Sequence, residues 1–134
     1  MKKILFIAIC SIASITTKAQ TNLPSITDTT VFVAVQQPAE FPGGSGKLKN
    51  TINKSFRYPE NARINNIQGK IPVMFVIEKD GSVSHAKVLK SMTADTDAEA
   101  IRVVSKLPKF KPAMQNGLPV RFEYVVEVSF YLAN

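Results

Sequence analysis

Residue types that could carry chemistry are few in this chain, and none is spaced like a catalytic or metal-binding site. Gly43–Lys47 (GGSGK) is similar to a phosphate loop, but it lacks the full Gly-x-x-x-x-Gly-Lys-Ser/Thr spacing, and a turn explains it better. His85 is the single histidine, without carboxylate or thiolate company for a metal. Asp95, Asp97 and Glu99 suit a helix start, which favours acidic side chains. We therefore expect no enzyme, no metal, no cofactor and no small-molecule substrate.

The net charge is basic, but its distribution does not indicate a nucleic-acid-binding protein. The chain has 17 Lys and Arg residues against 10 Asp and Glu residues, and they are scattered. The only tight group, Lys106, Lys109 and Lys111, lies in a connector bounded by prolines. It favours a solvated edge, with an anion or acidic-peptide patch as the alternative, because a mild basic excess alone says nothing of nucleic acid.

Residues 1–19 predict a signal peptide for secretion. Lys2 and Lys3 form a positive start, Ile4–Ile15 an apolar segment, and Thr17–Ala19 a small-x-small cleavage signal. A helix of roughly 12 residues would rise only about 18 Å, against about 30 Å for the bilayer core. The alternatives are a buried N-terminal helix or lipid attachment at Cys10. Cys10 is the only cysteine, so cleavage would leave a mature protein without disulfides.

The remaining chain is expected to form one domain behind a short lead-in. Residues 20–39 are the lead-in segment, which is polar at first and then carries Val31–Val35, a β-rich run that could pair as an extra edge strand. Residues 40–134 are the folded domain, which has the size of a single unit.

A β-hairpin is the strongest local prediction. Lys70–Glu78 has apolar residues on both faces, which is typical of a central strand or of one covered on both sides, and Asp80-Gly81 is a turn signal because Gly supplies positive φ. Pro72 lacks an N–H, so we expect it at the strand start or at a bulge. In the second strand, the apolar positions change parity, which predicts a bulge near His85–Lys87.

Two helices are expected in addition to a short helical turn at Pro59. Ser45 suits the N-cap of a helix that runs to about Ser55 and carries an apolar stripe. Thr96–Glu99 reads as a capping box for a second helix that ends near Leu107.

The last strand is the longest. From Val120 to Leu132 apolar residues alternate with more polar ones, which predicts a half-buried antiparallel strand with one face on helices and one in water. Together these elements predict an α+β fold, a three-stranded antiparallel sheet with two helices packed on one face. If the last strand lies at an edge, its backbone can pair with an extended peptide.

The spacing of several motifs resembles the TonB C-terminal domain family, over about residues 40–132. The shared features are a Tyr-Pro, an alanine after it, a glycine before an apolar strand, the Asp-Gly turn and the following strand end, together with a Phe-Pro-Gly-Gly and an Asn-Gly. They stand here as Tyr58-Pro59, Ala62, Gly69, Asp80-Gly81, Val88–Ser91, Phe41–Gly44, Asp97, Phe110, Pro112 and Asn116-Gly117.

The resemblance implies a partner and a site. Proteins of this family are the periplasmic ends of inner-membrane transducers that couple the proton gradient to outer-membrane transporters, and their sheet binds a transporter segment, the TonB box, by strand addition. The implied partners are an outer-membrane TonB-dependent transporter and possibly inner-membrane motor proteins, with no nucleic acid. The implied location is the periplasm, with an inner-membrane anchor if the N-terminus is retained. The expected peptide-binding residues are Arg57, Tyr58, Glu123, Val125, Glu127, Ser129 and Tyr131.

A second function remains open from the sequence. A transducer of this family has an uncleaved membrane helix and a long Pro-rich spacer, whereas residues 20–30 of this chain reach only about 35 Å when extended. The alternative is therefore a free periplasmic adaptor or structural protein-interaction module without energy coupling.

Overall fold

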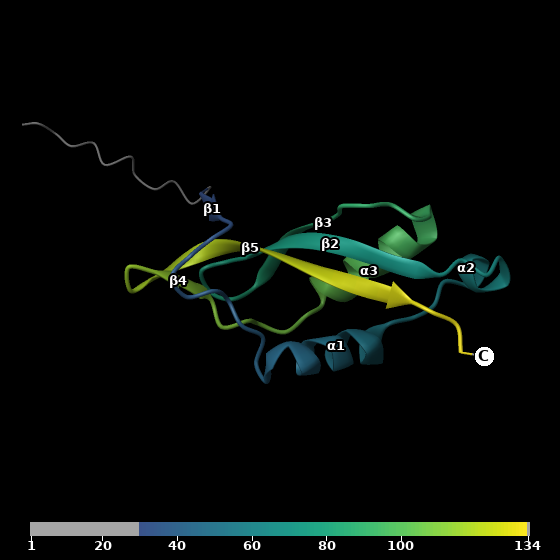
Figure 1. The fold of residues 1–134 in the computed structure, drawn as a ribbon, viewed down its shortest axis with the longest axis horizontal. Helices are drawn as coiled ribbons and strands as arrows, with labels where there is room; N and C mark the ends of the chain where they lie inside the picture. Colours follow the sequence, from purple (N-terminus) through teal and green to yellow (C-terminus); the bar gives the residue numbers. More distant parts are fainter. Residues whose placement is uncertain (1–29, 134) are drawn as a thin grey trace, which may run out of the picture.

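A computed structural model describes residues 30–133 of the chain, so the predicted signal peptide and the first half of the lead-in lie outside the described residues. None of the helices in this range is long and apolar enough to cross a membrane. Figure 1 shows the elements, which follow in chain order: β1 (Val31–Phe32), α1 (Gly44–Ser55), α2 (Glu60–Ile64), β2 (Gly69–Ile77), β3 (Val83–Val88), α3 (Ala94–Ser105), β4 (Ala113–Gln115) and β5 (Leu118–Phe130).

The predicted three-stranded antiparallel sheet is confirmed as the centre of a larger one. β2 lies between β3 and β5 and is antiparallel to both, with Gly69 opposite Phe130 and Ile77 opposite Phe122. The sheet also contains two short strands that the three-stranded prediction did not include. β1 pairs with β5 in parallel, over Val31–Phe32 only rather than to Val35, and β4 forms a small hairpin with the start of β5.

Both long helices cover one face of this sheet, as predicted, and α2 is a third, short helix (Figure 1). Leu48 and Ile52 of α1 and Val103 and Val104 of α3 are buried in the same cluster as the inward side chains of the sheet. On β2 the inward residues are Ile71, Val73, Phe75 and Ile77, all fully buried. These four alternate residues put one face of β2 in the core, while Val76 on the other face is also buried, at 8% exposure.

The Asp80-Gly81 turn joins β2 and β3 as predicted. Gly81 has φ of 87°, and its N–H donates to the carbonyl of Glu78 at 2.8 Å. The carboxylate of Asp80 accepts from the N–H of Ser82 at 2.9 Å. A Cβ on Gly81 would lie 2.0 Å from the carbonyl oxygen of Phe110, so both conformation and space require glycine here.

The predicted bulge in β3 is also present. Pairing with β2 shifts register between Met74 and Val76, and His85, at the shift, has φ of 51°. The extra residue lets Val83 and Val88 both turn toward the core despite their odd spacing.

The position predicted for Pro72 was wrong. It lies inside β2, opposite Glu127 of β5, and not at the strand start or at the bulge. Its carbonyl accepts from the N–H of Leu89 at 2.9 Å, so its backbone faces the β3 side. The missing N–H of Pro72 would therefore also face β3, so it interrupts no bond between β2 and β5. On the β3 side its neighbour Leu89 lies just beyond the end of the strand.

Both predicted helix caps were wrong by a few residues. Helix α3 begins earlier, with Thr93 as N-cap, and its capping box joins Thr93 to Thr96 rather than Thr96 to Glu99. Thr96 is fully buried and its hydroxyl bonds within the cap, while the carboxylate of Glu99 is engaged elsewhere. For α1 the N-cap position is Gly43, with φ of 91° and no side-chain cap, instead of Ser45.

Candidate functional site

One edge of β5 is only partly paired. Its first edge meets β4 at residues 118–120 and then β2 along residues 122–130. Its second edge meets β1 at Arg121 and Phe122. From Glu123 to Phe130 no strand within residues 30–133 pairs with this second edge, which we call the open edge. The predicted sheet edge is therefore present, but β1 closes its first part.

The backbone groups that point to the open edge can be assigned from the ladder. Because the Pro72 carbonyl faces β3, the backbone groups of Ile71 and Val73 face β5. Their partners Val128 and Val126 therefore turn their N–H and C=O groups toward β2. Leu132 has the same parity along the chain as Val128 and Phe130. Its N–H donates to the side chain of Gln68, which directly precedes β2, and this bond agrees with the assignment.

It follows that the alternate residues of β5 present their N–H and C=O groups to the open edge. These residues are Glu123, Val125, Glu127 and Ser129, which are four of the predicted peptide-binding residues.

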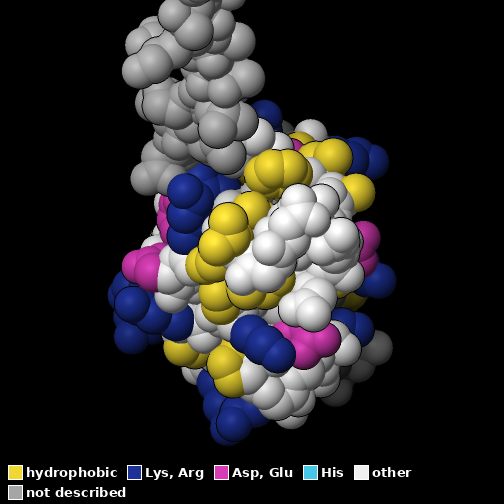
Figure 2. Space-filling view, turned by 90° about the vertical axis from the view of Figure 1, so that its left-hand side faces the viewer, with side chains coloured by type: hydrophobic (Ala, Val, Ile, Leu, Met, Phe, Trp, Pro, Cys, Tyr) yellow, Lys and Arg dark blue, Asp and Glu magenta, His cyan; other side chains and the backbone are white. Residues whose placement is uncertain are grey.

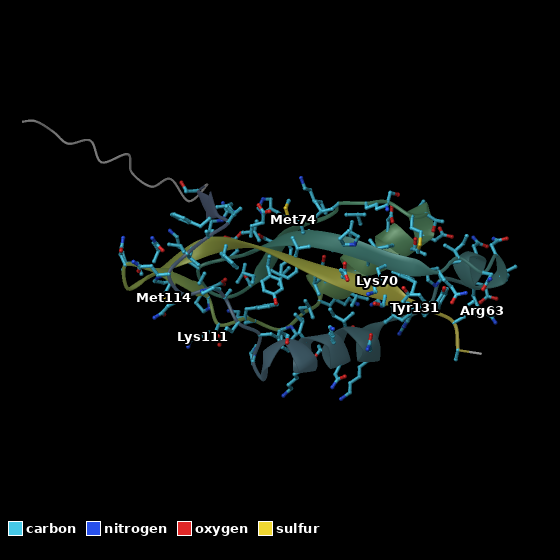
Figure 3. All side chains as sticks on the ribbon, in the orientation of Figure 1. Arg63, Lys70, Met74, Lys111, Met114 and Tyr131 are labelled. Carbon is cyan, nitrogen blue, oxygen red and sulfur yellow. The ribbon has the colours of Figure 1, made fainter. Side chains whose placement is uncertain are left out.

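Their side chains lie on the face of the sheet opposite the helices. Glu123 is half-buried, Glu127 and Ser129 are exposed, and Val125 is 47% exposed. Tyr131, the next residue of the predicted set, follows the end of β5 and is 59% exposed (Figure 3). The structure thus brings four predicted residues together along β5, with Tyr131 directly after its end.

Helix α1 runs alongside this edge and makes it a groove (Figure 1). Two hollows of about 240 and 120 Å³ lie between α1 and β5. They share Lys49 of α1 with Glu127 and Ser129 of β5. Ser45, Asn53 and the half-buried Tyr124 are also among the lining residues. We call this the edge groove; sequence reasoning missed α1 as its second wall.

Two charged side chains on the strand side of the edge groove form an ion pair. The Nζ atom of Lys70, which Figure 3 labels beside β5, lies 3.8 Å from a carboxylate oxygen of Glu127. Both side chains are more than half exposed, so this pair contributes little to stability, although it does offset the charge of Glu127.

The other two predicted residues lie in a separate place. Arg57 and Tyr58 belong to the connector between α1 and α2, and only Tyr58 approaches β5, its ring 5.9 Å from that of Phe130. Tyr58 is half-buried, contacts the ring of Phe56 as well, and donates its hydroxyl to the carbonyl of Ile67. The Tyr58 side chain thus fixes this connector, whereas Arg57 is exposed.

Helix α3 holds the same connector through charged hydrogen bonds. The N–H of Arg57 donates to Glu99 at 2.7 Å, and the Arg102 guanidinium donates to the carbonyl of Ser55 at 2.7 Å and to both oxygens of Glu99. Burial acts to raise the pKa of Glu99, but the hydrogen bonds from Arg102 and Arg57 outweigh it and hold that pKa below its usual value. Sequence reasoning missed this role, although an acidic and a basic residue three positions apart on a helix are a recognisable pair.

The end of the sheet near β1 carries a partly buried ion pair. Arg121, 8% exposed, donates to Glu78 from Nε at 2.7 Å and from Nη2 at 3.1 Å. These bonds, with one from Ser84, hold the pKa of Glu78 below its usual value.

Figure 2 views the molecule from this end and shows apolar side chains gathered across it, with Lys and Arg side chains around them. A cleft of about 230 Å³ opens here; its lining includes Phe32, Leu118 and Pro119.

Comparison with known proteins finds similarity to bacterial TonB proteins. The family described as "Gram-negative bacterial TonB protein C-terminal" matches residues 54–132. Protein TonB of Helicobacter pylori is 36% identical over 81 residues, which cover 57% of this chain and 28% of that protein. Protein TonB of Haemophilus influenzae is 34% identical over 125 residues, which cover 91% of this chain and 44% of that protein.

A solved structure supports the fold. The NMR solution structure of a Helicobacter pylori TonB C-terminal domain matches with a TM-score of 0.50 at 24% identity, over 69% of this chain and 88% of that one. The α+β sheet and the match over residues 54–132 define the class, a TonB C-terminal domain protein. The chain belongs to the Gram-negative bacterial TonB protein C-terminal family, and it spans less than half the length of the two curated relatives it matches.

Proposed function

We propose that this protein works in energy-coupled outer-membrane transport in the periplasm, where it binds the TonB box of an outer-membrane TonB-dependent transporter by strand addition. The observation that carries the proposal is the open edge of β5, with four residues whose N–H and C=O groups point away from β2. An extended peptide placed there gains main-chain hydrogen bonds whatever its side chains.

The size of the open edge fits a short peptide. Residues 123–130 extend about 26 Å at roughly 3.3 Å per residue. Since β1 pairs with Arg121 and Phe122, an added strand is confined to the part of β5 that follows. The connector with Arg57 and Tyr58 lies beyond the far end of the strand, next to Phe130, and we propose it as a second contact with the transporter.

Val125→Pro tests the proposal directly. The N–H of Val125 points to the open edge, so proline should leave the fold intact while it removes one donor and places a ring in the path of the peptide. We expect at least about tenfold weaker binding of a transporter box peptide, measured by fluorescence anisotropy, which corresponds to about 1.4 kcal/mol.

Val126→Pro is the matched control for this test. Its N–H bonds to β2, so the same substitution one residue away should destabilise the fold by about 1–3 kcal/mol or more, seen by circular dichroism. Glu123→Gln should change binding little, because main-chain bonds supply the affinity, and Arg57→Ala tests the second contact.

The results separate transport from a general adaptor role. If the parent protein binds no box peptide, or if a folded Val125→Pro variant and an Arg57→Ala variant both bind like the parent, the strand-addition proposal fails. The remaining reading is then a free adaptor or structural module without energy coupling. Interaction with inner-membrane motor proteins is a separate proposal, which co-purification from the native host tests.

A further inference from the structure

The helix that forms the second wall of the edge groove carries only positive charge. Residues 44–55 of α1 include Lys47, Lys49 and Lys54 and no Asp or Glu. Of these, Lys49 lines both hollows of the groove. Lys49 takes part in no ion pair or side-chain hydrogen bond within the described part of the chain. The Lys49 side chain thus lines the place where an added peptide would lie.

The strand side of the groove does not neutralise this charge. Glu127 lines the same hollows, but its carboxylate is already paired with Lys70, on the face of the sheet away from the helices. Glu123, the other acidic residue of the open edge, lies further toward β1 and lines neither hollow. The groove near Lys49 therefore keeps an excess of one positive charge, which a carboxylate of the partner can offset.

Strand geometry limits where that carboxylate can stand. Side chains of an added strand alternate between the helix side and the outer side of the sheet. A residue opposite Val126 or Val128 shares their face, which turns toward the helices and so toward α1 and Lys49. A residue of the other parity shares the outer face with Glu123 and Glu127, where the charge of Lys70 is already offset by Glu127.

We propose that the edge groove selects acidic extended peptides, with Lys49 as the residue that recognises a carboxylate on the helix-facing side of the bound strand. This inference rests on the proposed strand addition. It adds a preference for negative charge and states which side of the bound strand must carry that charge. Backbone pairing at the open edge supplies general affinity, while Lys49 distinguishes among peptides that can all form the same main-chain bonds.

Charge-matched peptides test this preference. We suggest blocked synthetic peptides of about nine residues that alternate Thr and Val, with Gln, Glu or Lys at one position and that position moved stepwise along the peptide. On the parent protein in about 10 mM salt, the Glu peptide should bind roughly five times more tightly than the Gln peptide at the best position. The preference should shrink in about 1 M salt, where charges are screened within about 3 Å, and should alternate between successive positions.

Two substitutions on the same helix locate the effect. Lys49→Gln should abolish the Glu-over-Gln preference, and Lys49→Glu should turn it into a preference for the Lys peptide. Lys54→Gln changes the same charge on an exposed residue outside the groove, so it should keep the preference of the parent.

The outcomes separate this inference from the proposed function. Equal binding of the Glu and Gln peptides, or a preference that survives Lys49→Gln, overturns the role of Lys49 and leaves strand addition standing. Suppose instead that the preference depends on Lys49 but the folded Val125→Pro variant binds the peptides as well as the parent does. The acid is then recognised without strand addition, and the proposed function fails. If none of these peptides binds the parent at millimolar concentration but a transporter box peptide does, the inference fails and the proposed function stands; if the box peptide does not bind either, both fail.

Discussion

Replacing Phe75 by alanine should be among the most damaging single changes in this protein. Phe75 lies in β2, two residues before its end, and is fully buried; its ring lies 5.4 Å from that of Tyr124 and 5.8 Å from that of Phe110. Removing it loses the transfer free energy of the ring and leaves a cavity, about 3–5 kcal/mol together. The two ring contacts place the expected loss toward the upper end of this range. Since domains unfold with about 5–15 kcal/mol, the variant should be close to its stability limit.

Urea unfolding followed by far-ultraviolet circular dichroism measures this loss. Val125→Ala is the control, because it lies on the same sheet but on the opposite face and is 47% exposed; it should cost less than about 1 kcal/mol. If Phe75→Ala does not fold, Phe75→Leu should still give a measurable loss of about 1–2 kcal/mol. A loss below about 1 kcal/mol for Phe75→Ala, or an equal loss for both alanine variants, would mean that the faces of β2 and β5 have been assigned wrongly.

Three further predictions concern the turn, the pH dependence and the N-terminus. Gly81→Ala should lower the free energy of unfolding in urea by at least about 1–3 kcal/mol more than Gly117→Ala does. Both glycines have positive φ, but only at Gly81 would the new Cβ clash with a backbone carbonyl. Equal losses would contradict this. Because Arg121 lowers the pKa of Glu78, this carboxylate stabilises the fold above about pH 4.3 and loses that effect as the pH falls through its lowered pKa. The urea midpoint of the parent should therefore decline between about pH 5 and 3, and Glu78→Gln should make this decline less steep. An unchanged slope in the variant refutes the prediction. Mass spectrometry of protein from the native host should find cleavage after Ala19, and retention of the first 19 residues on membrane-bound protein would contradict the signal peptide and favour an anchored transducer.

The central part of the fold could be predicted because its signals are local. Alternating apolar residues predict strand β2, Asp80-Gly81 predicts the turn, and the parity change of the apolar positions before Val88 predicts the bulge. Each of these depends on residues within one short segment. The half-buried character of β5 followed in the same way from alternation.

Features that depend on distant partners could not be predicted. Thr93 and Thr96 both suit an N-cap by type, and only the complete burial of Thr96 under the fold decides between them. Pro72 is tolerated inside β2 because of where β3 stops pairing, which the sequence of β2 does not contain. Likewise, the direction in which Val125 points its N–H follows from the register with β2, and the place of α1 beside β5 from packing between segments far apart in the chain.

The bulge at His85 has a consequence for how copies of this protein can associate. β3 forms the other edge of the sheet, and the bulge, together with Lys87, interrupts the straight row of backbone groups that a further strand needs. The described domain thus has one receptive edge rather than two. Edge-to-edge association through this domain should therefore end with a pair of copies instead of growing into a fibre.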